Sequence, residues 1–70
     1  MESYMQLGLN IRFYRRYKDY KQEGLSEKAG ISTVYLSKIE NAHSVPSLHV
    51  IFSIAKALQI PVHKLFEFRE

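Results

Sequence analysis

The chain has 70 residues, of which 46% are hydrophobic, with a net charge of +3 and no cysteine. This length allows one small domain, and the absence of thiols excludes both disulfides and thiolate metal sites. The hydrophobic fraction excludes a disordered chain, while no apolar run approaches the roughly 18 residues that a membrane span needs. The N-terminus lacks the pattern of a signal peptide. We therefore expect a single domain over residues 1–70, located in the reducing cytoplasm and not in a membrane.

The excess of basic residues fits a polyanionic partner, but it also fits many ordinary basic domains. Its distribution is more informative, because basic side chains crowd one region, before residue 22, while the acidic ones are scattered. These basic residues are Arg12, Arg15, Arg16, Lys18 and Lys21.

The first predicted element is an amphipathic helix over residues 7–18, preceded by a tail or a fraying turn. Leu7, Ile11 and Tyr14 recur at spacings of four and three, which marks one buried stripe. A second apolar line has a spacing of four, and it consists of Met5, Leu9, Phe13 and Tyr17. We expect this line to pack against the C-terminal helix, and the alternative is a surface for a partner.

Residues 22–41 predict two short helices that meet at a tight corner. Leu25 and Ala29 lie on one face of the first helix, and Gly30 is suited to the left-handed conformation that ends it. Ser32 can cap the second helix. This pattern predicts a helix-turn-helix. Gly24 inside the first helix costs about 1 kcal/mol relative to alanine.

The second of these helices has two distinct sides. Leu36 and Ile39 point inward, whereas the outer arc is polar but nearly uncharged. Hydroxyl, amide, methyl and ammonium groups can read base edges in DNA, so this arc predicts a recognition surface. The alternative is a plain helical hairpin with a surface of small residues. The outer arc consists of Thr33, Val34, Ser37, Lys38 and Asn41.

One charge falls on the buried stripe of the first helix. Arg15 lies there, and Glu40 lies at the inner edge of the second motif helix. A buried charge is costly unless it is paired, so we predict an ion pair between Arg15 and Glu40.

Beyond a loop over residues 41–46, Ser47 is expected to cap a fourth helix. Asn41 tolerates the left-handed conformation that can end a helix before this loop. Gln59 stands where a glycine is usual after the fourth helix, which implies either a strained residue or a different turn. Pro61 is suited to open a fifth helix, whose Leu65 and Phe66 should pack on the core. The apolar face of the fourth helix comprises Leu48, Ile51, Ile54, Ala55 and Leu58. Three apolar residues, namely Phe52, Val62 and Phe68, remain outside this core.

The strings LSEKAGISTVYLSKIEN and PSL resemble the helix-turn-helix domain of the lambda-repressor and Cro type, also called the xenobiotic-response-element family. The resemblance extends from about residue 7 to residue 66. It implies an all-α, compact five-helix domain in which helices 2 and 3 form the helix-turn-helix. The sequence departs from the family pattern at Lys21, where a capping Ser or Thr is usual.

Resemblance and surface pattern together predict a sequence-specific DNA-binding transcriptional regulator. Thr33, Val34, Ser37 and Lys38 are the expected base-reading residues. The expected contacts to the DNA backbone are Arg12, Lys21, Gln22, Tyr35, Asn41, His43 and Ser44.

One recognition helix reads few base pairs, so we expect a homodimer on a pseudo-palindromic operator, with Phe52, Val62 and Phe68 as interface candidates. A small stand-alone repressor or controller protein, regulated through its concentration, fits this length. The alternative function is a protein-interaction module, such as an antitoxin or bridging adaptor, that uses the second apolar line of helix 1.

Catalysis and cofactor binding are not expected. His43, His49 and His63 lack partners at metal-ligand spacing, and no glycine-rich phosphate loop or nucleophile elbow occurs. We therefore expect no metal, no cofactor, no small-molecule ligand and no enzymatic activity.

Overall fold

Residues 2–68 are described by a computed structural model, and between them four α-helices and one 3₁₀-helix follow one another without a strand. The all-α prediction is confirmed, but the fifth helix is a single short 3₁₀-helix. Helix α1 also begins five residues earlier than predicted. The helices are α1 (Glu2–Tyr17), α2 (Gln22–Ala29), α3 (Thr33–Glu40), α4 (Leu48–Leu58) and the 3₁₀-helix η1 (Val62–Phe66). None of the helices in this range is long and apolar enough to cross a membrane.

The helix ends follow the sequence signals. Gly30 takes the left-handed conformation after α2, with φ of 73°. The hydroxyl oxygens of Ser32 and Ser47 accept hydrogen bonds from the backbone N–H groups of Tyr35 and Val50, which caps α3 and α4. The side chain of Lys21 makes no such bond at the start of α2. These predictions are confirmed.

The turn after α3 differs from its prediction. Asn41 has φ of −99°, and it is Ala42 that takes the left-handed conformation, with φ of 60°. Asn41 still completes the helix end, because its backbone N–H donates to the carbonyl of Ser37. Gln59 ends α4 with φ of 60°, so of the two alternatives the strained residue is the one that the structure contains.

The core lies between α1, α2, α3 and α4, and Leu65 of η1 closes it. Two predicted members are exposed. Leu48 is 66% exposed, because a helical rotation of about 100° per residue turns it to the edge of the stripe centred on Ile51, Ile54 and Leu58. Phe66 is 42% exposed, because neighbouring side chains in a 3₁₀-helix are about 120° apart and Leu65 already points inward. The buried apolar residues are Leu7, Ile11, Leu25, Leu36, Ile39, Ile51, Ile54, Ala55, Leu58 and Leu65.

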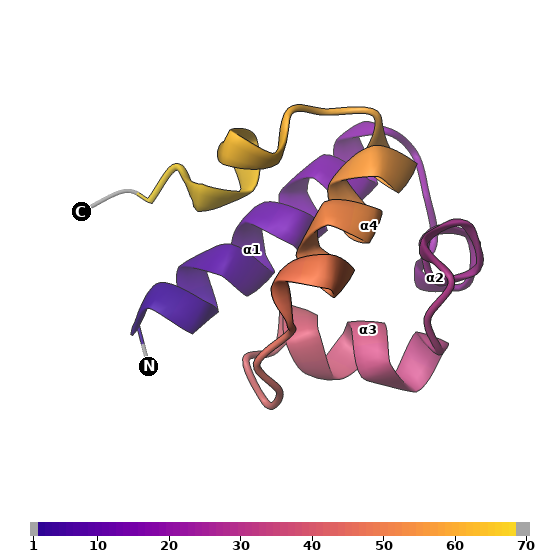
Figure 1. The fold of residues 1–70 in the computed structure, drawn as a ribbon. Coiled ribbons are helices and arrows are strands. Elements are labelled where there is room, and N and C mark those ends of the chain that lie inside the picture. Colours follow the sequence, from indigo (N-terminus) through magenta and orange to yellow (C-terminus); the bar gives the residue numbers. More distant parts are fainter. Residues whose placement is uncertain (1, 69–70) are drawn as a thin grey trace.

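Figure 1 shows how this packing presents α3. Helices α1 and α4 run side by side, α2 packs against α4, and α3 lies across one end of the molecule against α1. The chain turns sharply between α2 and α3 (Figure 1). One side of α3 therefore covers the core, and its other side faces away from the body of the protein.

Candidate nucleic-acid interface

The two sides of α3 differ in burial. Leu36 and Ile39 on the inner side are 0% and 1% exposed. On the outer side Val34 is 66% exposed, Lys38 is exposed, and Thr33 and Ser37 are half-buried. The four residues expected to read bases thus share the accessible side of α3.

A buried ion pair holds α3 from behind. Arg15 donates from Nε to Oε2 of Glu40 at 2.7 Å and from Nη2 to Oε1 at 3.1 Å. The Glu40 side chain is 0% exposed and that of Arg15 is 10% exposed. Gln22 donates a third bond to this carboxylate at 3.0 Å, and Arg15 donates from Nη1 to the carbonyl of Tyr20. Burying two charges costs free energy because they lose their hydration. Here the ion pair and the additional hydrogen bonds offset that cost.

A glycine brings the backbones of α1 and α3 into contact, and this feature was not recognised in the sequence. A Cβ atom on Gly8 would lie 2.5 Å from the carbonyl oxygen of Glu40 and 2.6 Å from that of Ile39. No larger residue fits there without movement of backbone. The available signal was a glycine directly after Leu7, on the side of α1 that also carries Arg15.

A pair of hydroxyl groups joins the two motif helices. Oγ of Ser26 lies 2.9 Å from Oγ1 of Thr33, and Ser26 also donates to the carbonyl of Glu23 at 3.0 Å. A hydroxyl has one hydrogen, and a carbonyl only accepts, so the bond to Glu23 uses the hydrogen of Ser26. Either hydroxyl of the pair could be the donor, and both contacts are hydrogen bonds at once when Thr33 donates to Ser26. The outward side of the Thr33 hydroxyl is then left with lone pairs only.

Three of the residues expected to contact the DNA backbone have polar groups that are bonded within the protein. Gln22 donates to Glu40, and Arg12 donates to Oδ1 of Asn41 at 2.8 Å. Asn41 donates in turn to the carbonyl of Ser37 at 2.9 Å. These side chains therefore form a network around the C-terminal end of α3.

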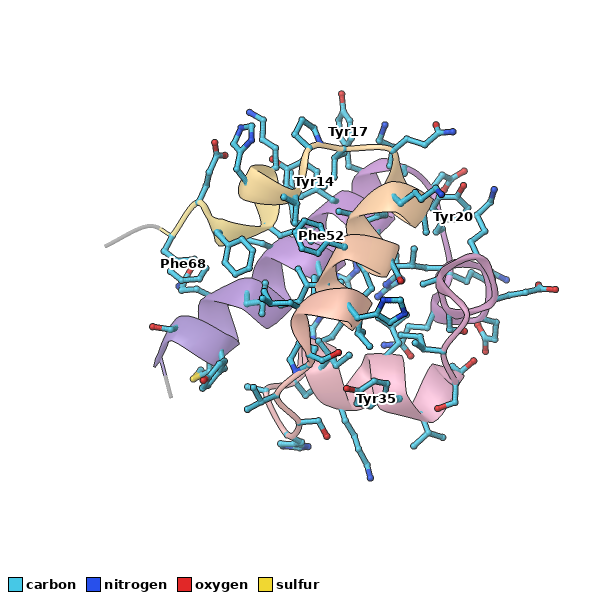
Figure 2. All side chains as sticks on the ribbon, in the orientation of Figure 1. Tyr14, Tyr17, Tyr20, Tyr35, Phe52 and Phe68 are labelled. Carbon is cyan, nitrogen blue, oxygen red and sulfur yellow. The ribbon has the colours of Figure 1, made fainter. Side chains whose placement is uncertain are left out.

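The other backbone candidates are more accessible. Lys21 and His43 are exposed, whereas Tyr35 and Ser44 are half-buried. Figure 2 shows Tyr35 on α3, at the edge of the molecule that α3 forms. Lys21 precedes α2, Tyr35 belongs to α3, and His43 and Ser44 follow α3.

The interface candidates lie on other elements. Phe52 of α4 is 54% exposed and Phe68 is 42% exposed, while Val62 is partly buried against the core. Figure 2 places Phe52 on α4 and Phe68 after η1, both away from Tyr35. Within residues 2–68 no group of three His, Cys, Asp or Glu residues could hold a metal ion.

The sharp corner between α2 and α3, with one side of α3 covered and the other free, defines a helix-turn-helix protein. A family model described as Helix-turn-helix matches residues 11–65, and the chain belongs to this family. The HTH-type transcriptional regulator SinR of Bacillus subtilis (strain 168) is 37% identical over 62 residues, which cover 87% of this chain and 56% of that protein. The chain thus spans about half the length of that curated relative.

Two solved structures agree with this family. The restriction-modification controller protein C.AhdI from Aeromonas hydrophila superposes with a TM-score of 0.92 at 29% identity, covering 94% of this chain and 100% of that chain. The master regulator for biofilm formation SinR, in complex with DNA, superposes with a TM-score of 0.80 at 37% identity, covering 87% of this chain and 98% of that chain. The resemblance to the lambda-repressor and Cro type is confirmed.

Proposed function

We propose that the chain is a sequence-specific DNA-binding transcriptional regulator, a repressor or controller protein, that inserts α3 into the major groove. The observation that carries this proposal is the accessible, weakly charged outer side of α3 on a helix whose inner side is fixed by a buried ion pair. Likeness to SinR, solved in complex with DNA, and to the controller C.AhdI supports the same class of partner. The proposal includes no enzymatic activity. We also propose that the protein acts in the cytoplasm.

Each of the four residues proposed to read bases offers a chemical group that fits a particular base edge. Val34 can meet a thymine methyl group, and Lys38 can donate to the acceptor atoms of guanine. Thr33, whose hydrogen is committed to Ser26, offers acceptor lone pairs and should favour the amino group of adenine or cytosine. Ser37 can donate or accept. This set would discriminate only a few base pairs.

Contacts to phosphate would hold the register of α3. We assign Lys21 at the start of α2 and His43, which follows α3, to this role with Tyr35 and Ser44. Three further residues position the end of α3 through their internal hydrogen bonds, namely Arg12, Gln22 and Asn41. Their remaining donor and acceptor groups would be free to contact phosphate.

Reading more than one half-site requires two copies. We propose a homodimer through Phe52, Val62 and Phe68, with the two recognition helices about 34 Å apart on a pseudo-palindromic operator. The exposure of Phe52 and Phe68 supports this surface, because apolar side chains that gather in an exposed patch mark interaction sites. We take residues 1–70 to act as one domain with a core at about residues 7–66, without a cofactor or small-molecule ligand.

Selection of bound duplexes from a random DNA pool tests the function. We expect enrichment of an inverted repeat whose half-sites are about one helical turn, or a multiple of it, apart. Affinity for the enriched duplex should fall steeply with salt, with a slope near −0.9 per phosphate neutralised. A pool without enrichment, or an affinity independent of salt, would contradict the proposal. Sedimentation of the Phe52→Ala variant tests the dimer separately, since a mass equal to that of the wild type would contradict this interface.

A further inference from the structure

The second apolar line of α1 is not covered by the C-terminal segment, so the prediction that it packs there was wrong for most of its length; only Phe13 borders that segment, where it lines a small hollow with Lys64, Glu67 and Phe68. Met5 and Phe13 are each 53% exposed, Leu9 is 46% exposed and Tyr17 is 74% exposed. The reason is the direction of the buried stripe: Leu7, Ile11 and Tyr14 already use the side of α1 that faces the core. The four residues therefore form a continuous exposed row.

This row borders two adjoining hollows. One, of about 490 Å³, is lined by Leu9, Arg12, Phe13, Arg16 and Tyr17. The other is lined by Met5, Leu9, Arg12, Glu40 and Asn41, so the two share Leu9 and Arg12. We call the surface formed by Met5, Leu9, Arg12, Phe13, Arg16 and Tyr17 the α1 groove. The rings of Phe13 and Tyr17 stack at 6.2 Å with an interplanar angle of 11°, which gives the groove an ordered aromatic wall.

The charges around the α1 groove are basic. Arg16 is exposed and takes part in none of the ion pairs found within residues 2–68. The side chain of Arg12 is 29% exposed, and its Nε lies 3.6 Å from Oε1 of Glu40. Glu40 lines the Met5 end, but its side chain is fully buried and bonded to Arg15 and Gln22. Glu67 lies near Phe13, but it is paired with Lys64 at 3.8 Å. A ligand in the groove therefore meets apolar side chains and the positive charge of Arg16.

We propose that the α1 groove binds an acidic amphipathic helix of a partner protein. A helix such as α1 has no unpaired strand edge, so a partner cannot add its backbone to it and must satisfy its own hydrogen bonds. The row from Met5 to Tyr17 is about 18 Å long at 1.5 Å per residue, which matches a partner of about three turns. Its apolar residues would recur every three or four positions, with Asp or Glu beside them.

A second copy of this chain is the less suitable occupant. Two copies that met through their α1 grooves would bring arginines of one against arginines of the other, and like charges across an interface oppose association. The Phe13 end of the groove is also remote from the face proposed for DNA, since Tyr17 lies at the end of the molecule opposite α3 (Figure 2). The inference thus does not depend on the proposed function.

Panning a phage-displayed library of random 16-residue peptides against the full chain tests this inference. Enriched peptides should be acidic and should carry apolar residues every three or four positions. Calorimetry with one such synthetic peptide should show an affinity lower by about tenfold or more for both Phe13→Ala and Arg16→Glu. The matched control is Leu48→Ala, because Leu48 is 66% exposed on α4 and belongs to neither the α1 groove nor the proposed dimer interface. It should bind the peptide like the wild type.

Several results would overturn the inference. These are a library without enrichment, enriched peptides that are basic, or enriched peptides that bind both groove variants as tightly as the wild type. Sedimentation provides a further one, namely a dimer that Phe13→Ala dissociates and Phe52→Ala does not, which would assign the groove to a second copy. Thermal unfolding shows whether Phe13→Ala is folded, and if it is not, Arg16→Glu decides, because that exposed side chain supports no core contact.

Discussion

The inner and outer sides of α3 are built for different tasks. On the inner side Glu40 accepts three hydrogen bonds, and two backbone carbonyls of α3 lie against Gly8 of α1. On the outer side Val34 and Lys38 are exposed. The difference indicates that one set of residues fixes the position of α3 and that a separate set would set the proposed preference for a DNA sequence. Changes on the inner side should therefore alter stability, and changes on the outer side should alter DNA preference alone.

The largest effect should come from the buried carboxylate. Glu40→Ala leaves Arg15 buried without its partner, and we expect the free energy of unfolding to fall by about 3 to 5 kcal/mol. Urea unfolding followed by circular dichroism measures it. Glu27→Ala, at an exposed position in α2, is the control and should change stability by no more than about 0.5 kcal/mol. Equal losses for the two variants would show that the ion pair does not hold α3.

The two glycines inside helices should respond to alanine in opposite directions. Gly8→Ala forces a Cβ atom against the carbonyl oxygens of α3, and we expect a loss of about 1 to 3 kcal/mol. Gly24→Ala meets only Cδ1 of Tyr20, at 3.5 Å, and should gain about 0.5 to 1 kcal/mol from reduced chain entropy. The urea midpoints of both variants measure this. A stabilised Gly8→Ala variant would contradict the close crossing of α1 and α3.

On the outer side, Lys38→Ala should weaken binding to the selected duplex by about 1 to 3 kcal/mol and relax the preference at one base pair. Its urea midpoint should equal that of the wild type, because the side chain is exposed. Fluorescence anisotropy with a set of single-base operator variants provides the measurement. Lys21→Ala is the comparison, and it should weaken all sequences alike. If both variants weaken every sequence uniformly, Lys38 does not read a base.

The smallest effect should come from Ser26, which links the two sides. Ser26→Ala removes the acceptor of the Thr33 hydrogen, so that Thr33 can also donate to a base. The preference for an amino-bearing base at one operator position should weaken by about 1 kcal/mol. Repeated selection from the random pool with this variant measures the change. An operator identical to that of the wild type would show that Thr33 does not meet a base edge.

Local signals in the sequence were sufficient for the elements and for much of the core. Gly30, Ser32 and Ser47 act through their own backbone or a bond three residues away, and the spacing of Leu7 and Ile11 marks a buried stripe. Each depends on neighbours in the chain, so each could be predicted. The placement of Arg15 and Glu40 on inward stripes likewise indicated the pair that the structure contains.

Apart from the pair of Arg15 and Glu40, features that depend on the distance between elements could not be predicted. The contact of Gly8 with α3 exists only because α1 crosses α3 closely. The hydrogen bond between Ser26 and Thr33 exists only because α2 meets α3 at the turn. Phe66 is exposed because η1 is short and Leu65 already takes its inward position, which the apolar pattern does not show. The exposure of Phe13 likewise depends on how α1 packs against the other helices, so the apolar spacing along α1 did not reveal it.

A crystal structure of the chain with its selected duplex would test the role of α3 most directly. We predict that α3 lies in the major groove with Thr33, Val34, Ser37 and Lys38 within contact distance of base edges, and that the bonds between Arg15 and Glu40 are unchanged. A complex in which the duplex contacts another face, with the outer side of α3 turned toward solvent, would contradict this prediction.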